Sequence, residues 1–222
     1  MSDLSPQLQQ ASSQLSVSSY FDEALFQRES SGIFTRGPRY VGHHLSVPHL
    51  GDYAALPHEA AGRALVHTQA GVELISNVCR HRQSLLLKGR GSLNAGTSSG
   101  NIVCPLHHWT YSANSPSSID GGPGSLKTGT LIGAPHFAQD PCLNLNNYPL
   151  QSWNGLLFEK NADSRNVALD LAHIGPLADL DFSGHVLDRV EMHSATTTGK
   201  PSSRSIWRTT TSAPSTPAWA AW

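Results

Sequence analysis

The sequence predicts a mainly β fold: an antiparallel, β-sandwich-like domain with a short N-terminal helix and an irregular C-terminal tail. Only 14% of the residues are charged, while 19 glycines and 14 prolines interrupt the chain. This composition favours a loop-rich β protein over a helical bundle. Between Tyr40 and Lys160 the apolar segments are also short and are separated by Gly, Pro and His, as strands of a small sheet are.

The N-terminal region divides into a polar tail and a helical lead. Residues 1–19 are rich in Ser and Gln and predict a disordered tail. They contain no basic segment followed by an apolar one, so no secretory signal is expected, and a cytoplasmic location follows by default. Residues 20–35 carry a weak helical stripe of apolar side chains that ends at Ser-Ser-Gly.

Residues 36–160 are expected to form the β domain. The tripeptide Gln69–Gly71 predicts a hairpin turn, and the Gly-, Ser- and Pro-rich residues 112–129 predict an exposed loop. Metal-binding side chains are expected on the loops between strands. The predicted strands are 40–48, 52–57, 64–69, 72–78, 100–105, 130–135 and 152–160.

Charge, hydropathy and cysteine content exclude several classes of protein. The chain has 15 basic and 16 acidic residues, which argues against nucleic acid or an acidic membrane as a partner held by bulk charge. No apolar segment approaches the roughly 18–20 residues of a membrane span. Three cysteines do not suit a disulfide scaffold, so metal binding or redox chemistry is the better explanation of the Cys and His residues.

Two short motifs mix thiolate and imidazole ligands. Cys79 and His81 form C-x-H, and Cys104 and His107 form C-x-x-H. One hypothesis is a closed Cys₂His₂ zinc site, although zinc fingers keep their cysteines together and their histidines together. A second is a Rieske [2Fe–2S] cluster, in which two cysteines hold one iron and two histidines the other. The third is that these are polar loop residues without a metal.

The residues around these motifs resemble a known family. NVCRHRQ and CPLHHWTY are similar to the Rieske domain of ring-hydroxylating oxygenase α subunits, and the resemblance extends over about residues 20–190. It implies that Cys79 and Cys104 bind one iron of a [2Fe–2S] cluster and that His81 and His107 bind the other. Respiratory Rieske proteins have two further cysteines, where this chain has Ser84 and Leu106. The cluster is therefore expected to be of the oxygenase or Rieske-ferredoxin type, with a reduction potential near the low end of the roughly −150 to +300 mV range of Rieske clusters.

Neighbouring residues have expected roles as well. His108 stands where the family has glycine or a basic residue, and we expect it to have a structural or solvent-facing role rather than to bind iron. Trp109 and Tyr111 are expected to pack the cluster loop. Arg80 and Arg82 either donate hydrogen bonds near the cluster or are solvated, with nothing in the sequence to favour one. Cys142 is expected to be a buried, unbridged thiol.

The C-terminal region departs from the family. Residues 161–195 resemble the start of the link to a catalytic domain, whereas residues 196–222 are rich in Thr, Ser, Pro and Trp without periodicity. One interpretation is a disordered linker. The other is a frameshift, because codons chosen for these residues and regrouped one nucleotide earlier can encode a segment similar to the family's catalytic domain, including two iron-binding histidines.

The resemblance predicts an electron-transfer function. We expect a Rieske domain that passes single electrons toward a mononuclear non-haem Fe(II) that this chain does not bind, so that no catalytic residue is assigned and activity of the chain alone is uncertain. The family implies an NAD(P)H-dependent reductase, sometimes a ferredoxin, and trimers, whose assembly is doubtful here. The alternative is a non-catalytic truncated gene product or a Cys₂His₂ zinc-binding module.

Overall fold

The computed structural model describes residues 19, 21–93, 100–113, 127–139, 141–160 and 181–192. The chain divides into two compact units, one of residues 1–33 with 193–222 and the other of residues 34–192. In the first unit, helix α2 (Glu23–Glu29) begins after Asp22, whose side chain accepts a hydrogen bond from the Leu25 amide. A π-helical turn, Ser30–Phe34, follows it. The short N-terminal helix is therefore confirmed.

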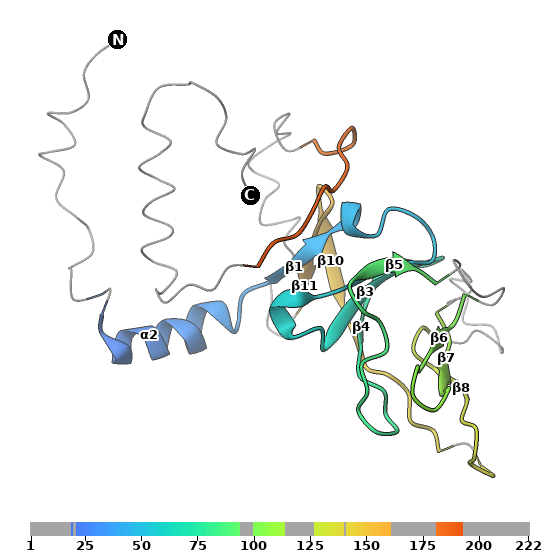
Figure 1. The fold of residues 1–222 in the computed structure, drawn as a ribbon. Helices are drawn as coiled ribbons and strands as arrows, with labels where there is room; N and C mark the ends of the chain where they lie inside the picture. Colours follow the sequence, from blue (N-terminus) through green and yellow to red (C-terminus); the bar gives the residue numbers. More distant parts are fainter. Residues whose placement is uncertain are drawn as a thin grey trace, which may run out of the picture. The chain divides into compact units, whose positions relative to one another are not determined.

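The largest sheet of the second unit is five-stranded and antiparallel (Figure 1). At its centre is the hairpin of β3 and β4, in which Thr68 pairs with Gly71 across a two-residue turn, as the sequence predicted. The strand order is β5-β2-β3-β4-β9, with bounds β2 (Asp52–Ala55), β3 (Arg63–Thr68), β4 (Gly71–Ser76), β5 (Arg90–Ser92) and β9 (Asn147–Tyr148).

A second sheet has three antiparallel strands in the order β1-β11-β10. Its strands are β1 (Arg39–His43), β10 (Leu150–Trp153) and β11 (Leu156–Glu159). The prediction of one strand over 152–160 is wrong: Asn154 and Gly155 have positive φ and form the turn of a hairpin. The predicted strand 40–48 ends at His43, because residues 44–46 form a 3-10 helix.

The third sheet is small and carries one of the two candidate ligand loops. Its strands are β6 (Ile102–Val103), β7 (Thr110–Tyr111) and β8 (Leu131–Gly133), paired antiparallel in chain order. The sequence did not predict β5, β7 or β9, which are two or three residues long. Strands this short lack the alternating pattern that identifies a strand. The mainly β, antiparallel fold is confirmed.

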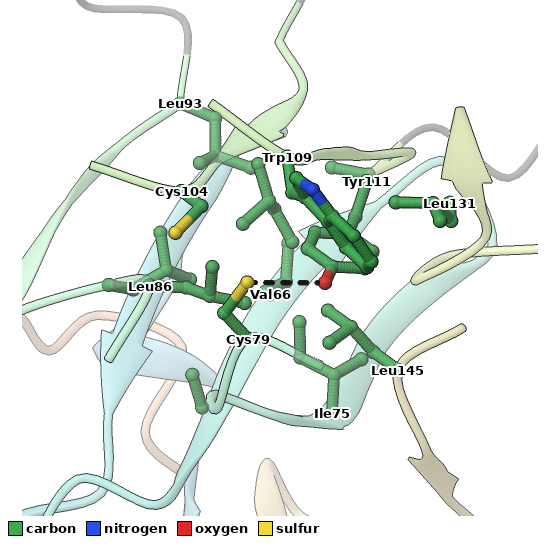
Figure 2. Packing of buried hydrophobic residues seen from close by; sticks show 14 residues of the cluster. Val66, Ile75, Cys79, Leu86, Leu93, Cys104, Trp109, Tyr111, Leu131 and Leu145 are labelled. Carbon is green, nitrogen blue, oxygen red and sulfur yellow. Dashed lines mark hydrogen bonds between the residues drawn. The ribbon is translucent and has the colours of Figure 1, made fainter. Parts of the chain in front are cut away.

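Two clusters of buried side chains lie in the second unit, and the β3–β4 hairpin contributes to both. Leu65 and Leu74 belong to one cluster, while Val66 and Ile75, their neighbours in sequence, belong to the other. This alternation follows from the two faces of a strand. We call the first the aliphatic core: Val41, Val47, Ala54, Leu56, Leu65, Leu74 and Leu157. We call the second the thiol core, because it contains Cys79 and Cys104 with Trp109 and Tyr111 (Figure 2).

An ion network joins the two larger sheets. Glu59 pairs with Arg39 and Arg63, and Glu159 lies 2.8 Å from Arg63 and 3.4 Å from Arg39. The Arg63, Glu59 and Glu159 side chains are only 13%, 14% and 15% exposed, and Arg63 also lies over the Tyr148 ring at 4.7 Å. Charges this far removed from water require their partners.

Several predicted segments lie outside the described residues. These are the N-terminal tail up to residue 18, most of the 112–129 loop, the start of the link at 161–180, and the tail from residue 193 onward. What the sequence predicts for these segments stays a prediction. No helix in the part of the chain that the structure describes is long and apolar enough to cross a membrane.

Candidate metal centre

The first ligand loop, residues 78–86, leaves β4 and is closed on itself. Val78 forms an isolated bridge with Leu85, and the Cys79 amide donates to the Ser84 carbonyl at 2.8 Å. The Gln83 amide donates back to the Cys79 carbonyl at 3.0 Å, and Gln83 has a φ of 56°. Cys79 is therefore fixed through both of its backbone polar groups, with a thiol that is buried to 1% exposure.

The second loop, residues 104–109, repeats this arrangement between β6 and β7. The Cys104 amide donates to the Trp109 carbonyl at 2.8 Å, and the His108 amide donates to the Cys104 carbonyl at 3.0 Å. Cys104 is also 1% exposed. His108 takes a φ of 59°, which only a tight turn requires, and its side chain is exposed. Of the two roles expected for His108, the exposed side chain supports the solvent-facing one.

The two loops bring their histidines together. The rings of His81 and His107 lie 4.8 Å apart at an interplanar angle of 70°. Trp109 stacks on His81 at 4.8 Å with the ring planes only 6° apart, and the edge of Phe137 meets both rings. His81 is thus held by aromatic contacts, and the expected packing role of Trp109 has a specific partner. Phe137, after β8, was not predicted as part of this site.

Three buried polar atoms at this place have no hydrogen-bond partner in the described part of the chain. They are Nδ1 of His81, Nδ1 of His107 and Nε1 of Trp109. A buried polar atom without a partner is costly and is rare in folded proteins. A metal accepts a nitrogen lone pair, so ligation through Nδ1 would satisfy both imidazoles. Two buried thiols and two unpaired imidazole nitrogens fit the donor set of a Rieske cluster.

Tyr111 connects the site to its surroundings. Its hydroxyl accepts a hydrogen bond from the Arg80 amide at 3.0 Å and lies 3.4 Å from Cys79 Sγ (Figure 2). Because the oxygen already accepts from an N–H, its proton is available for the sulfur. Burial raises the pKa of Tyr111 well above its usual range, which keeps the phenol protonated as a donor. For His81, burial lowers the imidazole pKa, and His107, Arg82 and His136 lower it further.

The outer surface of the two loops is basic and partly apolar. Arg80, Arg82, His108 and His136 are exposed, as are Leu106 (55%) and Phe137 (48%). The described residues 78–84, 103–109 and 133–139 contain no Asp or Glu. Arg80 and Arg82 are therefore solvated rather than buried. Cys142 was expected to be buried, but it is exposed; as expected, it forms no disulfide.

The grouping of the candidate ligands distinguishes a site for one metal ion from a binuclear site. Among the residues that the structure describes, no three His, Cys, Asp or Glu side chains are grouped so as to hold one metal ion. A Rieske cluster takes only two protein ligands at each iron.

Comparison with known proteins gives the class of this domain. Residues 41–134 match the family model described as "Rieske [2Fe-2S] domain". The matched segment includes both ligand loops and the five-stranded sheet except β9. The chain therefore contains a Rieske domain, whose cofactor is a [2Fe–2S] cluster.

The curated relatives extend the match beyond this domain. Putrescine 2-hydroxylase of Ralstonia nicotianae is 52% identical over 195 residues, which cover 87% of this chain and 47% of the relative. Putrescine 2-hydroxylase of Bordetella bronchiseptica is 46% identical over 192 residues, covering 82% and 41%. The large oxygenase component of the naphthalene 1,2-dioxygenase system of Pseudomonas aeruginosa is 35% identical over 94 residues, covering 42% and 20%.

The relatives that the chain matches are Rieske oxygenase α subunits, the class that its motifs predicted. The chain spans less than half the length of the curated relatives that it matches.

Proposed function

We propose that the two loops hold the [2Fe–2S] cluster, with Cys79 and Cys104 on one iron and His81 and His107 on the other. The observation that carries this assignment is the pair of buried Nδ1 atoms of His81 and His107, one from each motif, that have no hydrogen-bond partner among the described residues. The cluster, when bound, takes up and passes on one electron at a time.

The protein's own residues prepare this site for electron transfer. Tyr111 donates to the Cys79 sulfur, which favours the more negative, reduced state of the site. Trp109 and Phe137 cover His81 and limit its contact with water. Among the described residues, the His107 ring contacts the ring of His81 and no other ring, and exposed Leu106 precedes His107 in the chain.

The basic outer surface of the loops supports a partner with acidic groups around its redox centre. Arg80 and Arg82 flank His81 in sequence, and both are exposed. We propose an NAD(P)H-dependent reductase, with or without a ferredoxin, as the electron source, because opposite charges accelerate encounter between redox partners. The electron acceptor is a mononuclear non-haem iron in the catalytic domain. In the whole protein, a trimer would supply this domain.

For the whole protein we propose an aliphatic diamine as the substrate. The two most similar relatives above are named putrescine 2-hydroxylases and align with more than four-fifths of the chain. The resemblance to ring-hydroxylating oxygenases instead implies an aromatic substrate, which stays a prediction that the naphthalene relative supports. The predicted frameshift near residue 196 is checked by DNA sequencing across codons 195–196.

The test of the cluster assignment is spectroscopic. The chain is purified without oxygen, its iron and sulfide are measured, and the reduced protein is studied by low-temperature EPR. We expect about two irons and two sulfides per chain, a brown colour and an anisotropic Rieske signal. A colourless protein that contains one zinc would overturn the assignment and favour the Cys₂His₂ zinc module. Because the chain is expected not to bind the mononuclear iron, the substrate is tested separately on the whole protein, by assaying putrescine hydroxylation with the reductase and with a full-length relative as the positive control.

A further inference from the structure

We infer that Asn77 is a positioning residue for the cluster, because its side chain ties together the two ends of the first ligand loop. This inference rests on the proposed function, since it concerns how Cys79 and His81 are held. Asn77 is a polar side chain with 0% exposure, and it comes directly after β4, two residues before Cys79.

Every polar atom of the Asn77 side chain has a partner. Nδ2 donates to the carbonyls of Ala61 and Leu87, both at 2.8 Å, and Oδ1 accepts from the Leu87 amide at 2.8 Å. The backbone also takes part, because the Leu86 amide donates to the Asn77 carbonyl at 3.0 Å. Asn77 therefore binds the chain where the loop begins and where it ends.

The second loop does not need such a residue. It is flanked by the ladder of β6 and β7, in which Ile102 pairs with Tyr111 and Val103 with Thr110. The first loop has only the single bridge between Val78 and Leu85. The two side-chain hydrogen bonds between Asn77 and Leu87 thus take the place of the strand pairing that the second loop has.

Asn77 also connects the loop to the ion network. Its amide group holds the Ala61 carbonyl, and its backbone amide donates to the Gly62 carbonyl at 2.9 Å. Ala60 and Ala61 have φ values of 50° and 59°, a left-handed conformation that is strained for residues with a Cβ. Persistence of such a turn requires fixed partners, and the turn lies directly between Glu59 and Arg63 of the ion network.

The chemistry required at this position is that of a primary amide. Two donors and an acceptor on a short side chain meet the two carbonyls and the amide. A carboxylate keeps the acceptor for Leu87 but faces two carbonyl oxygens with no proton to donate, while alanine leaves all three backbone groups unpaired.

The experiment compares Asn77→Asp and Asn77→Ala with Leu157→Ala in the full chain. Leu157 is 1% exposed in the aliphatic core, so its truncation destabilises the fold without touching either loop. Two measurements are made on each variant: amide hydrogen exchange of residues 78–87 in the cluster-free chain, and the rate of cluster loss to an iron chelator in the loaded chain. The reduction potential and EPR spectrum of the loaded chain accompany the second measurement.

We expect faster exchange at Leu86 and Leu87 in both Asn77 variants and faster cluster loss by at least about tenfold, since one buried unpaired group already has an effect of that size. The EPR line shape should shift as well. Leu157→Ala should lower the denaturation midpoint but leave loop exchange, EPR and potential at their wild-type values. Asn77 variants that match Leu157→Ala in all these measurements would overturn the inference. A wild-type chain without a Rieske signal would instead overturn the proposed function, while the exchange data would still test the loop contacts.

Discussion

The two cores of the second unit differ in what they leave unsatisfied. The aliphatic core consists of Val, Ala and Leu side chains, and the charges beside it are paired in the network of Arg39, Glu59, Arg63 and Glu159. The thiol core contains two thiols, and three of the four unpaired buried polar atoms found in the described residues lie at its ligand loops. One region is complete as a protein fold, whereas the other is complete only with a bound group.

The largest expected effect comes from removing a ligand of the thiol core. Cys104→Ser should abolish the Rieske EPR signal and lower Tm by roughly 10 °C, since a ligand bound at a thousand times its Kd contributes about 4 kcal/mol. Calorimetry and EPR of the two proteins check this. Cys142→Ser, the exposed cysteine, is the matched control and should change neither. Equal signals in wild type and Cys104→Ser would contradict the ligand assignment.

The next effect tests the ion network of the other region. Glu59→Gln leaves Arg63, 13% exposed, with only part of its partners, and we expect a loss of about 1–3 kcal/mol in unfolding free energy. Urea denaturation measures it, and the EPR spectrum of the cluster should not change. As a control, Arg189→Gln breaks pairs whose side chains are 53–83% exposed and should cost about 0–1 kcal/mol. A cost no larger than that of the control would mean that the network is solvated.

A smaller effect is expected inside the thiol core without loss of the cluster. Tyr111→Phe removes the hydroxyl that lies 3.4 Å from Cys79 Sγ. Because that hydrogen bond favours the reduced site, the potential should fall by on the order of 60 mV, a tenfold change in a one-electron equilibrium. Redox titration followed by EPR measures it, and an unchanged potential would show that the hydroxyl donates elsewhere.

The smallest effect concerns His43, the one unpaired buried polar group away from the ligand loops in the described residues. Its Nδ1 accepts from the Leu45 amide, and burial, with a smaller effect of His44, lowers its pKa below the ordinary value of 6.5 against the opposing effect of the Asn154 backbone. The unfolded chain then binds the proton more readily, so stability is full above about pH 6.5 and declines as the pH falls below it. His43→Asn keeps an acceptor and should flatten this decline, as urea midpoints between pH 5 and 8 would record.

The sequence indicated which residues meet at the candidate site more completely than it predicted the strands. C-x-H and C-x-x-H singled out the four residues that we propose as ligands, and the structure buries both cysteines and brings the two histidine rings to 4.8 Å; their role as ligands stays a prediction. Strands of two residues, such as Thr110–Tyr111, have no periodicity to detect. The hairpin at Asn154–Gly155 did carry a turn signal, which the apolar residues on either side obscured.

Other features depend on contacts that no single sequence reveals. Asn77 looks like any polar residue before a loop until its three hydrogen bonds to Ala61 and Leu87 are seen. The same holds for Phe137, which reaches His81 from a segment far along the chain. Cys142 was expected to be buried because unbridged cysteines usually are, but it is exposed, whereas Leu145 in the same segment is buried.

The five-stranded sheet has a further consequence for association between copies of the chain. Its edge strands are β5, which is three residues long and begins with Arg90, and β9, which is two residues long and is followed by Pro149. A short edge that carries a charge or ends at a proline offers few unpaired backbone groups to a second strand. The sheet that holds the first ligand loop is thereby protected against edge-to-edge aggregation.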